Sequence, residues 1–187
     1  HSDSPEAYFC HTPGLKVVVP STPYEAKGLL VAAIRDPDPV IFLEPKRVYR
    51  AIKEDVPEEE YTIPLSKCNV VQEGNDVTVI SWGSALRTCK EAIASSKQSI
   101  ELIDVRTLSP LDTETILKSV QKTGRAVIVQ EAQRTCSFSS ELAALIAEKA
   151  LLYLKAPVKR VAGFDIVTPL PKLENYYLPS VERINRA

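Results

Sequence analysis

The sequence predicts an α/β fold with a largely parallel sheet, and three observations support this. Short apolar segments alternate with amphipathic ones, the amphipathic segments are long enough to be crossover helices, and proline or glycine separates many of them. Because crossovers between parallel strands are right-handed, we expect a doubly wound sheet with helices on both faces.

The first fifty residues predict helix, strand, helix and strand in turn. Ser4 has the position of an N-cap before Pro5, and Thr22 and Glu25 have the spacing of a capping box. The second helix should carry an apolar stripe of Leu29, Leu30, Ala33 and Ile34. The expected elements are a helix at 4–14, a strand at 15–19, a helix at 22–36 and a strand at 40–44.

Residues 51–69 read as a linker. The run 54–60 is acidic and interrupted by Pro57, which is typical of a solvated connector between domains. An acidic docking patch is the alternative interpretation.

Residues 70–187 predict a second unit of alternating strands and helices. Asp112 should cap one of its helices and Gly124 should end it. The expected strands are 77–83, 100–105, 126–131 and 158–163, and the expected helices are 84–96, 112–122, 139–152 and one that starts at Pro179. The helix at 139–152 is apolar nearly all round, which fits a core position or a subunit interface.

Composition excludes several classes of protein. The net charge is −1, so no basic footprint for nucleic acid or membrane surfaces is present. The longest apolar stretch, 142–147, is far shorter than the ~20 residues of a membrane-spanning helix. The sequence has no methionine, so we expect it to be a piece of a longer protein.

The motifs of self-contained catalytic sites are absent from the sequence. There is no GxGxxG, no GxxxxGK[ST], no GxSxG and no HExxH. The four cysteines include no CxxC pair and only two histidines are present, so we expect isolated thiols and no zinc cluster. A nucleotide site or a hydrolase formed by this chain alone is therefore not expected.

Two features could carry chemistry. The imidazole of His1 could move a proton near neutral pH, although a terminal histidine can equally be without function. At 36–39 the sequence Asp-Pro-Asp-Pro follows a helix, and freed carbonyls beside carboxylates suit a hard monovalent cation. Prolines after a helix are also simple stop signals.

Long blocks of the sequence resemble the β subunit of thiamine-dependent 2-oxo acid dehydrogenases. The resemblance covers essentially the whole chain, and the segments HSDSPEA and EPKRVYR look like the branched-chain type rather than the similar pyruvate type. The blocks that carry it are 1–30, 36–50, 55–65, 103–112, 122–132 and 140–157, followed by GFDIVTPLP and YYLPSVERI.

The resemblance implies a domain organisation and a reaction. Residues 1–50 would be the end of a thiamine pyrimidine-binding domain, 51–69 a linker and 70–187 a transketolase C-terminal-like domain with a parallel or mixed sheet. The reaction would be decarboxylation of a branched-chain 2-oxo acid with acyl transfer to a lipoyl group, pyruvate being the alternative substrate. The cofactor would be thiamine diphosphate with Mg²⁺, held mostly by an α subunit, so this chain alone should be inactive.

The resemblance also assigns site residues and partners. His1 would be the catalytic histidine that supplies a proton in acyl transfer, and Ala33, Asp36 and Asp38 would belong to a structural K⁺ site. The partners would be the α subunit, a second β subunit and the lipoyl acyltransferase core, in the bacterial cytoplasm or the mitochondrial matrix. A second hypothesis is that the chain is a non-catalytic assembly module. In either case, we expect the strands at 15–19 and 40–44 to lack neighbours and to expose their edges.

Overall fold

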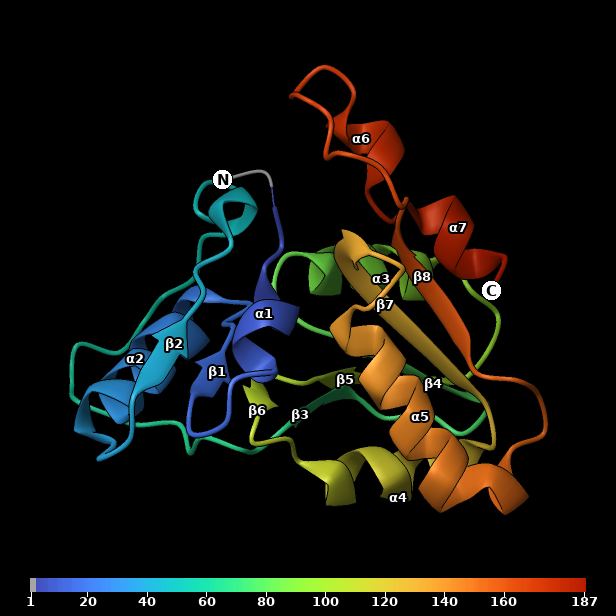
Figure 1. Cartoon of the computed structure of the whole chain (residues 1–187), viewed down its shortest axis with the longest axis horizontal. Coiled ribbons are helices and arrows are strands. Elements are labelled where there is room, and N and C mark those ends of the chain that lie inside the picture. The colour runs from blue at the N-terminus through green and yellow to red at the C-terminus, as the bar shows by residue number, and fades with distance from the viewer. Residues whose placement is uncertain (1–2) are drawn as a thin grey trace.

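The structure, a computed structural model, describes residues 3–187 and has a mixed α/β fold. Within these residues the strands form two sheets, one of three strands in the order β2-β1-β6 and one of five in the order β3-β5-β4-β7-β8 (Figure 1). The predicted fold class is therefore confirmed.

The elements follow the predicted order, with two additional strands, β3 and β6, and one additional short helix, α6. The strands are β1 (Lys16–Val18), β2 (Val40–Phe42), β3 (Asn69–Gln72), β4 (Val77–Ser81), β5 (Ile100–Asp104), β6 (Thr107–Ser109), β7 (Ala126–Gln133) and β8 (Lys159–Gly163). The helices are α1 (Glu6–Cys10), α2 (Pro23–Arg35), α3 (Ala85–Ala94), α4 (Thr113–Thr123), α5 (Phe138–Ala150), α6 (Glu174–Tyr177) and α7 (Val181–Asn185), with 3₁₀ turns η1 (Lys46–Val48) and η2 (Leu151–Tyr153).

The larger sheet is doubly wound. Strands β5, β4, β7 and β8 are parallel, and β3 pairs antiparallel with β5 at one edge. Side chains from α4 and α5 share a buried cluster with one face of this sheet, whereas α3 and α7 pack on the other face (Figure 1). The central strands carry apolar side chains on both faces, so helices pack on both sides of this parallel sheet and remove those side chains from water.

The smaller sheet is completed by a strand from the second half of the chain. β1 lies between β2, which is parallel to it, and β6, which is antiparallel to it. Val17 and Val18 are fully buried. The prediction that residues 15–19 expose an edge is therefore wrong, because the three residues of β6, for which no strand was predicted, cover it. β2 does lie at the edge of its sheet.

A buried ion pair joins the two parts of the chain beside this pairing. The Arg106 Nε donates to Glu25 Oε1 at 2.7 Å, and both side chains are largely buried. The Arg106 backbone, at φ +57°, also donates from its N–H to Asp104 Oδ1 at 3.3 Å. We call Glu25, Asp104 and Arg106 the Arg106 clamp.

In the Arg106 clamp the guanidinium pairs with Glu25, whereas Asp104 accepts from the Arg106 backbone N–H. Asp104 is fully buried and its Oδ2 has no hydrogen-bond partner among the described residues. Burial and, secondarily, the neighbouring Glu25 charge raise the pKa of Asp104 well above its usual range, more than Arg106 lowers it. The folded state therefore favours the neutral acid at this position.

Several local predictions are corrected. The first helix is shorter than expected, and Pro5 rather than Ser4 occupies its N-cap position without a side-chain cap. Thr22 accepts from the Glu25 N–H as predicted, but the Glu25 carboxylate accepts from Ser21 rather than from Thr22. Of the expected stripe on α2 only Leu29 is buried, because the helix meets its sheet and the connector through one narrow face.

The connector is less solvated than predicted because its end packs on α2. Tyr61 stacks on Tyr24 with ring centroids 4.6 Å apart, and the Ile63 N–H donates to the Gly28 carbonyl at 3.0 Å. Lys27 donates to the connector carbonyls of Glu58 and Glu59 at 3.1 and 2.9 Å. The acidic side chains of the run 54–60 remain exposed.

We expect Arg106→Met to lower the free energy of unfolding by about 3–5 kcal/mol, because it leaves the largely buried Glu25 carboxylate without its cation. Urea denaturation followed by circular dichroism measures this. Arg87→Met is the matched control, since Arg87 pairs with Glu91 on the exposed face of α3 and should matter by only about 0.5 kcal/mol. Equal effects of the two substitutions would contradict the role of the Arg106 clamp.

We expect Asp104→Asn to change how stability depends on pH. Because the pKa of Asp104 is raised by folding, its stabilising contribution is fully present below the unfolded pKa of about 3.9 and is lost as the pH rises through the higher folded pKa. Asparagine cannot ionise, so the stability of the variant does not fall in this way. The free energy of unfolding of the variant, relative to that of the wild type, should therefore rise by on the order of 1 kcal/mol between pH 4 and pH 8. Asp55→Asn, in the exposed connector, is the control. A constant difference between Asp104→Asn and the wild type over this range would show that Asp104 does not titrate in this way.

Candidate functional site

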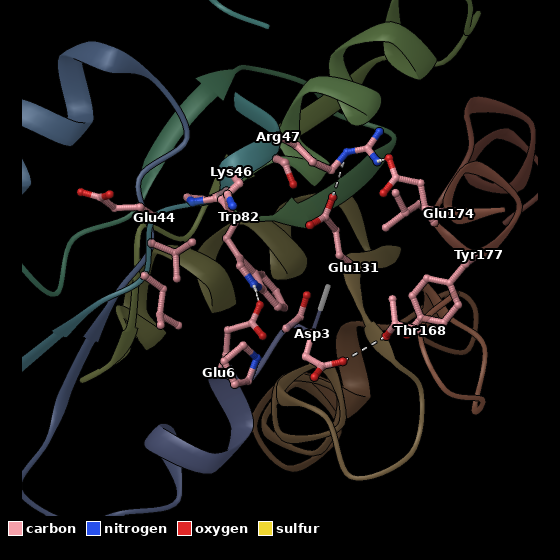
Figure 2. A pocket seen from close by; sticks show the side chains of 18 residues that line it. Asp3, Glu6, Glu44, Lys46, Arg47, Trp82, Glu131, Thr168, Glu174 and Tyr177 are labelled. Carbon is pink, nitrogen blue, oxygen red and sulfur yellow. Dashed lines mark hydrogen bonds and ion pairs between the residues drawn. The ribbon is translucent and has the colours of Figure 1, made fainter. Parts of the chain in front are cut away.

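A cavity of about 490 Å³ lies where the carboxyl ends of four strands meet. β1 and β2 of the smaller sheet and β4 and β7 of the larger one deliver residues to it (Figure 2). In the larger sheet, β5 lies on one side of β4 and β7 on the other. The chain runs from β4 to β5 and then crosses back to β7, so the winding of the sheet reverses between β4 and β7. Open α/β sheets bind ligands at such a point.

One wall of the cavity is a carboxyl group held by an indole. The Trp82 Nε1–H, just after β4, donates to Glu6 Oε1 in α1 at 3.0 Å (Figure 2). Trp82 also packs edge-on against Phe138 with ring centroids 5.5 Å apart. Burial raises the pKa of Glu6, and the hydrogen bond from Trp82 opposes this more weakly.

A second carboxyl group lies across the cavity on β7. Burial raises the pKa of Glu131, while the nearby Ser84 hydroxyl and Arg47 guanidinium lower it and the Glu6 charge adds to the rise. The Arg47 Nε is 3.9 Å from Glu131 Oε1, and its Nη1 is 2.8 Å from Glu174 Oε1 (Figure 2). The guanidinium is thus shared between two carboxylates.

The turn from β4 into α3 forms the floor. Gly83 has φ +58°, and a Cβ there would approach Pro45 Cγ and Val19 Cγ1 to 3.1 Å, so glycine lets the two sheets meet closely. Ser84 follows at the N-cap position of α3, but its hydroxyl caps no helix N–H. Its Oγ is buried without a hydrogen-bond partner among residues 3–187.

The remaining wall comes from the C-terminal segment. Thr168 Oγ1 donates to Asp3 Oδ1 at 3.3 Å, and Glu174 and Tyr177 of α6 close the far side (Figure 2). Together the walls combine buried carboxyl groups, a hydroxyl and a guanidinium. Such a set can bind a small molecule rich in oxygen atoms and can hold a proton at Glu6 or Glu131.

A second cavity of about 780 Å³ lies between α1, β6 and the start of α5. Cys10 and the exposed Cys136 line it, and burial raises the pKa of Cys10 to about 12, so this thiol is not poised to react. No buried polar atom without a partner lines this cavity among the described residues. The first cavity is therefore the better candidate site.

The residues predicted from sequence are placed as follows. His1 lies outside the described residues. Asp36 and Asp38 come together around Lys16, whose Nζ lies 2.6 and 3.1 Å from their carboxylates, and the Ala33 carbonyl accepts from the Asp36 N–H at 3.3 Å. The two carboxylates thus share one ammonium group.

Sequence analysis missed the residues that form the cavity: Glu6, Trp82, Ser84 and Glu131. Only the position of Trp82-Gly83-Ser84 directly after a buried strand could have pointed to them. Within residues 3–187 no group of three or more His, Cys, Asp or Glu side chains could hold a metal ion. Nor does this part of the chain contain a helix long and apolar enough to cross a membrane.

Comparison with known families places both parts of the chain. Residues 66–184 match the C-terminal domain of transketolase, and residues 1–52 match the transketolase pyrimidine-binding domain. The chain belongs to the transketolase C-terminal domain family. A solved structure of a split-gene transketolase, described as an inactive beta4 tetramer, shares the fold with a TM-score of 0.79 at 22% identity, over 97% of this chain and 58% of that one.

Curated relatives of the chain include β subunits of pyruvate and 2-oxoisovalerate dehydrogenases. The pyruvate dehydrogenase E1 component subunit beta of Acholeplasma laidlawii is 51% identical over 98% of this chain and 57% of its own length. The mitochondrial 2-oxoisovalerate dehydrogenase subunit beta of Dictyostelium discoideum is 52% identical over 96% of this chain and 49% of its own length. The mitochondrial 2-oxoisovalerate dehydrogenase subunit beta 2 of Arabidopsis thaliana is 50% identical over 98% of this chain and 52% of its own length. The chain spans about half the length of the curated relatives it matches.

Proposed function

We propose that this chain is part of the β subunit of a thiamine-diphosphate-dependent dehydrogenase that decarboxylates branched-chain 2-oxo acids and transfers the acyl group to lipoyl groups. The observation that carries the proposal is identity of about 50% over almost the whole chain to β subunits of this kind. Pyruvate is the alternative substrate, since the pyruvate and branched-chain relatives are 51% and 52% identical. The branched-chain choice rests on the segments 1–7 and 44–50.

The cofactor would be held mostly by an α subunit. When bound, thiamine diphosphate supplies the electron sink that stabilises the carbanion formed on decarboxylation. The described residues do not fit the magnesium–diphosphate group, since they offer no cluster of three metal-ligating side chains. The K⁺ site proposed at Ala33, Asp36 and Asp38 would use backbone carbonyls, because Lys16 already occupies the carboxylates.

His1 is proposed as the catalytic residue that supplies a proton during acyl transfer. Two facts support this role. An imidazole exchanges protons near neutral pH, and the residues that follow it, from Asp3 to Glu6, line the cavity.

The proposed partners are the α subunit, a second β subunit and the lipoyl acyltransferase core. In support, large apolar side chains are exposed in η2 and along 164–176: Leu152 is 95% exposed, Val167 92%, Leu170 80% and Tyr176 79%. Exposed large apolar side chains that follow one another closely, as along 164–176, are typical of protein interfaces. It also supports the second hypothesis, a non-catalytic assembly module. The proposed location is the bacterial cytoplasm or the mitochondrial matrix.

The test is decarboxylation by the β subunit assembled with its α subunit, thiamine diphosphate and Mg²⁺. We expect kcat/KM for 3-methyl-2-oxobutanoate to exceed that for pyruvate by about tenfold or more, because each extra methylene in a fitted apolar pocket adds discrimination of that order. The chain without the α subunit should release no CO₂. In the same assay, His1→Ala should slow transfer to the lipoyl group by about 100-fold while decarboxylation with an artificial electron acceptor changes little.

Three outcomes would change the account. Faster turnover of pyruvate would replace the branched-chain assignment by the alternative. No turnover of either acid would overturn the proposed enzyme activity. If binding of the acyltransferase core persisted in that case, the assembly-module hypothesis would take its place.

A further inference from the structure

Residues 3–6, which lead into α1, line the cavity, and two side-chain hydrogen bonds tie them to the second part of the chain. The Glu6 carboxyl accepts from the Trp82 indole N–H at 3.0 Å, and the Asp3 carboxyl accepts from the Thr168 hydroxyl at 3.3 Å (Figure 2). Trp82 directly follows β4, and Thr168 belongs to the C-terminal segment. Residues far away in the sequence therefore hold 3–6 at the cavity.

The bond between Trp82 and Glu6 is the better protected of the two. Glu6 is 8% exposed and Trp82 3%, whereas Asp3 is exposed. Phe138 packs edge-on against the indole and holds the direction of its N–H. Because water does not compete for a buried hydrogen bond, the bond of Glu6 should hold the segment more firmly than that of Asp3.

The start of α1 depends on this one bond. Within residues 3–187 no second side chain bonds the Glu6 carboxyl, and its Oε2 is buried without a partner. Glu6 is also the only buried residue of α1, a helix of five residues with no side-chain cap. Without the indole N–H the carboxyl would be buried and unpaired, so it should turn towards water and take its backbone with it.

We propose that Trp82 and Glu6 are positioning residues, whose hydrogen bond fixes residues 3–6 at the cavity and thereby places His1 for acyl transfer, a role that rests on the proposed function. His1 comes two residues before Asp3 in the sequence, and consecutive Cα atoms are about 3.8 Å apart. The position of the segment thus limits where the imidazole can lie. Neither Trp82 nor Glu6 takes part in a covalent or proton-transfer step here.

Loss of this bond should act on one step of the reaction. A displacement of about 1 Å can slow the step that a catalytic group assists by on the order of 100-fold. In the proposed function that step is transfer of the acyl group to the lipoyl group. Decarboxylation measured with an artificial electron acceptor does not include it, so the two assays separate loss of positioning from general damage.

The experiment uses the β subunit assembled with its α subunit, thiamine diphosphate and Mg²⁺. Trp82→Phe removes the N–H and keeps a ring against Phe138. Glu6→Leu removes the acceptor, whereas Glu6→Gln keeps an acceptor oxygen and removes the charge. Tyr8→Leu, at an exposed position of the same helix, is the matched control. Thermal unfolding verifies that each variant is folded, and Glu6→Leu, which leaves the indole in place, decides the question if Trp82→Phe does not fold.

We expect Trp82→Phe and Glu6→Leu to slow transfer to the lipoyl group by about 10- to 100-fold, while decarboxylation with the artificial acceptor stays within about twofold. Glu6→Gln should stay within about threefold of the wild type, because its amide oxygen still accepts from the indole. Tyr8→Leu should behave as the wild type. In the His1→Ala background, Trp82→Phe should slow transfer no further, because the bond acts through His1.

Hydrogen exchange followed by mass spectrometry measures the position of the segment without turnover. The Tyr8 N–H donates to the Pro5 carbonyl and the His11 N–H to the Ala7 carbonyl, so these amides report on α1. In the same assembled enzyme, the peptide that covers α1 should exchange about tenfold faster in Trp82→Phe and Glu6→Leu than in the wild type. The peptides of β7 should stay protected.

Wild-type transfer rates in folded Trp82→Phe and Glu6→Leu would overturn the proposal. So would a loss that is equally large in the His1→Ala background or with the artificial acceptor. The proposed function fails separately: if the wild type turns over neither acid, the function is refuted, and faster exchange of α1 in the variants still shows that the bond positions the segment. Turnover by the wild type with unchanged exchange in the variants would refute the positioning and keep the function.

Discussion

The pairing of β1 with β6, with the Arg106 clamp beside it, is the constraint on which the rest of the molecule depends. Three residues of β6 supply the strand that covers β1, and the Val19 N–H donates to the Arg106 carbonyl at 2.7 Å at the same place. The guanidinium of Arg106 then neutralises Glu25 of α2 in a largely buried position. Because one buried cluster runs from Val17 and Val19 through Ile80 to Ile128, the two parts of the chain share a buried core.

This constraint also creates the candidate site. It brings the carboxyl ends of β1 and β2 against those of β4 and β7, and the cavity fills the space between them (Figure 2). Glu6 comes from one part of the chain, whereas Trp82, which holds it, and Ser84 come from the other. The cavity wall is therefore assembled only when both parts are joined, which explains why buried polar atoms can remain unpaired there: the shared core, rather than local hydrogen bonding, stabilises their positions.

Much of the fold could be predicted from the sequence, and little of the site. The parallel strands and their crossover helices follow from alternating apolar and amphipathic segments, and the capping by Asp112 and the left-handed Gly124 are confirmed. β6 could not be predicted, because three residues carry no periodicity and their partner, β1, lies about ninety positions earlier in the chain. Glu6 and Glu131 look like ordinary surface acids in the sequence. Their burial depends on contacts between elements far apart in the chain, which local patterns do not encode.

The central claim is that the two parts of the chain form one cooperative unit through β1 and β6. Native-state hydrogen exchange in low concentrations of denaturant measures it most directly, because it gives an opening free energy for each amide. The account predicts that the buried amides of β1 open with the same free energy as those of β4 and β7, that is, by global unfolding. Opening of β1 by a separate and less costly event, while β4 and β7 stay protected, would contradict it.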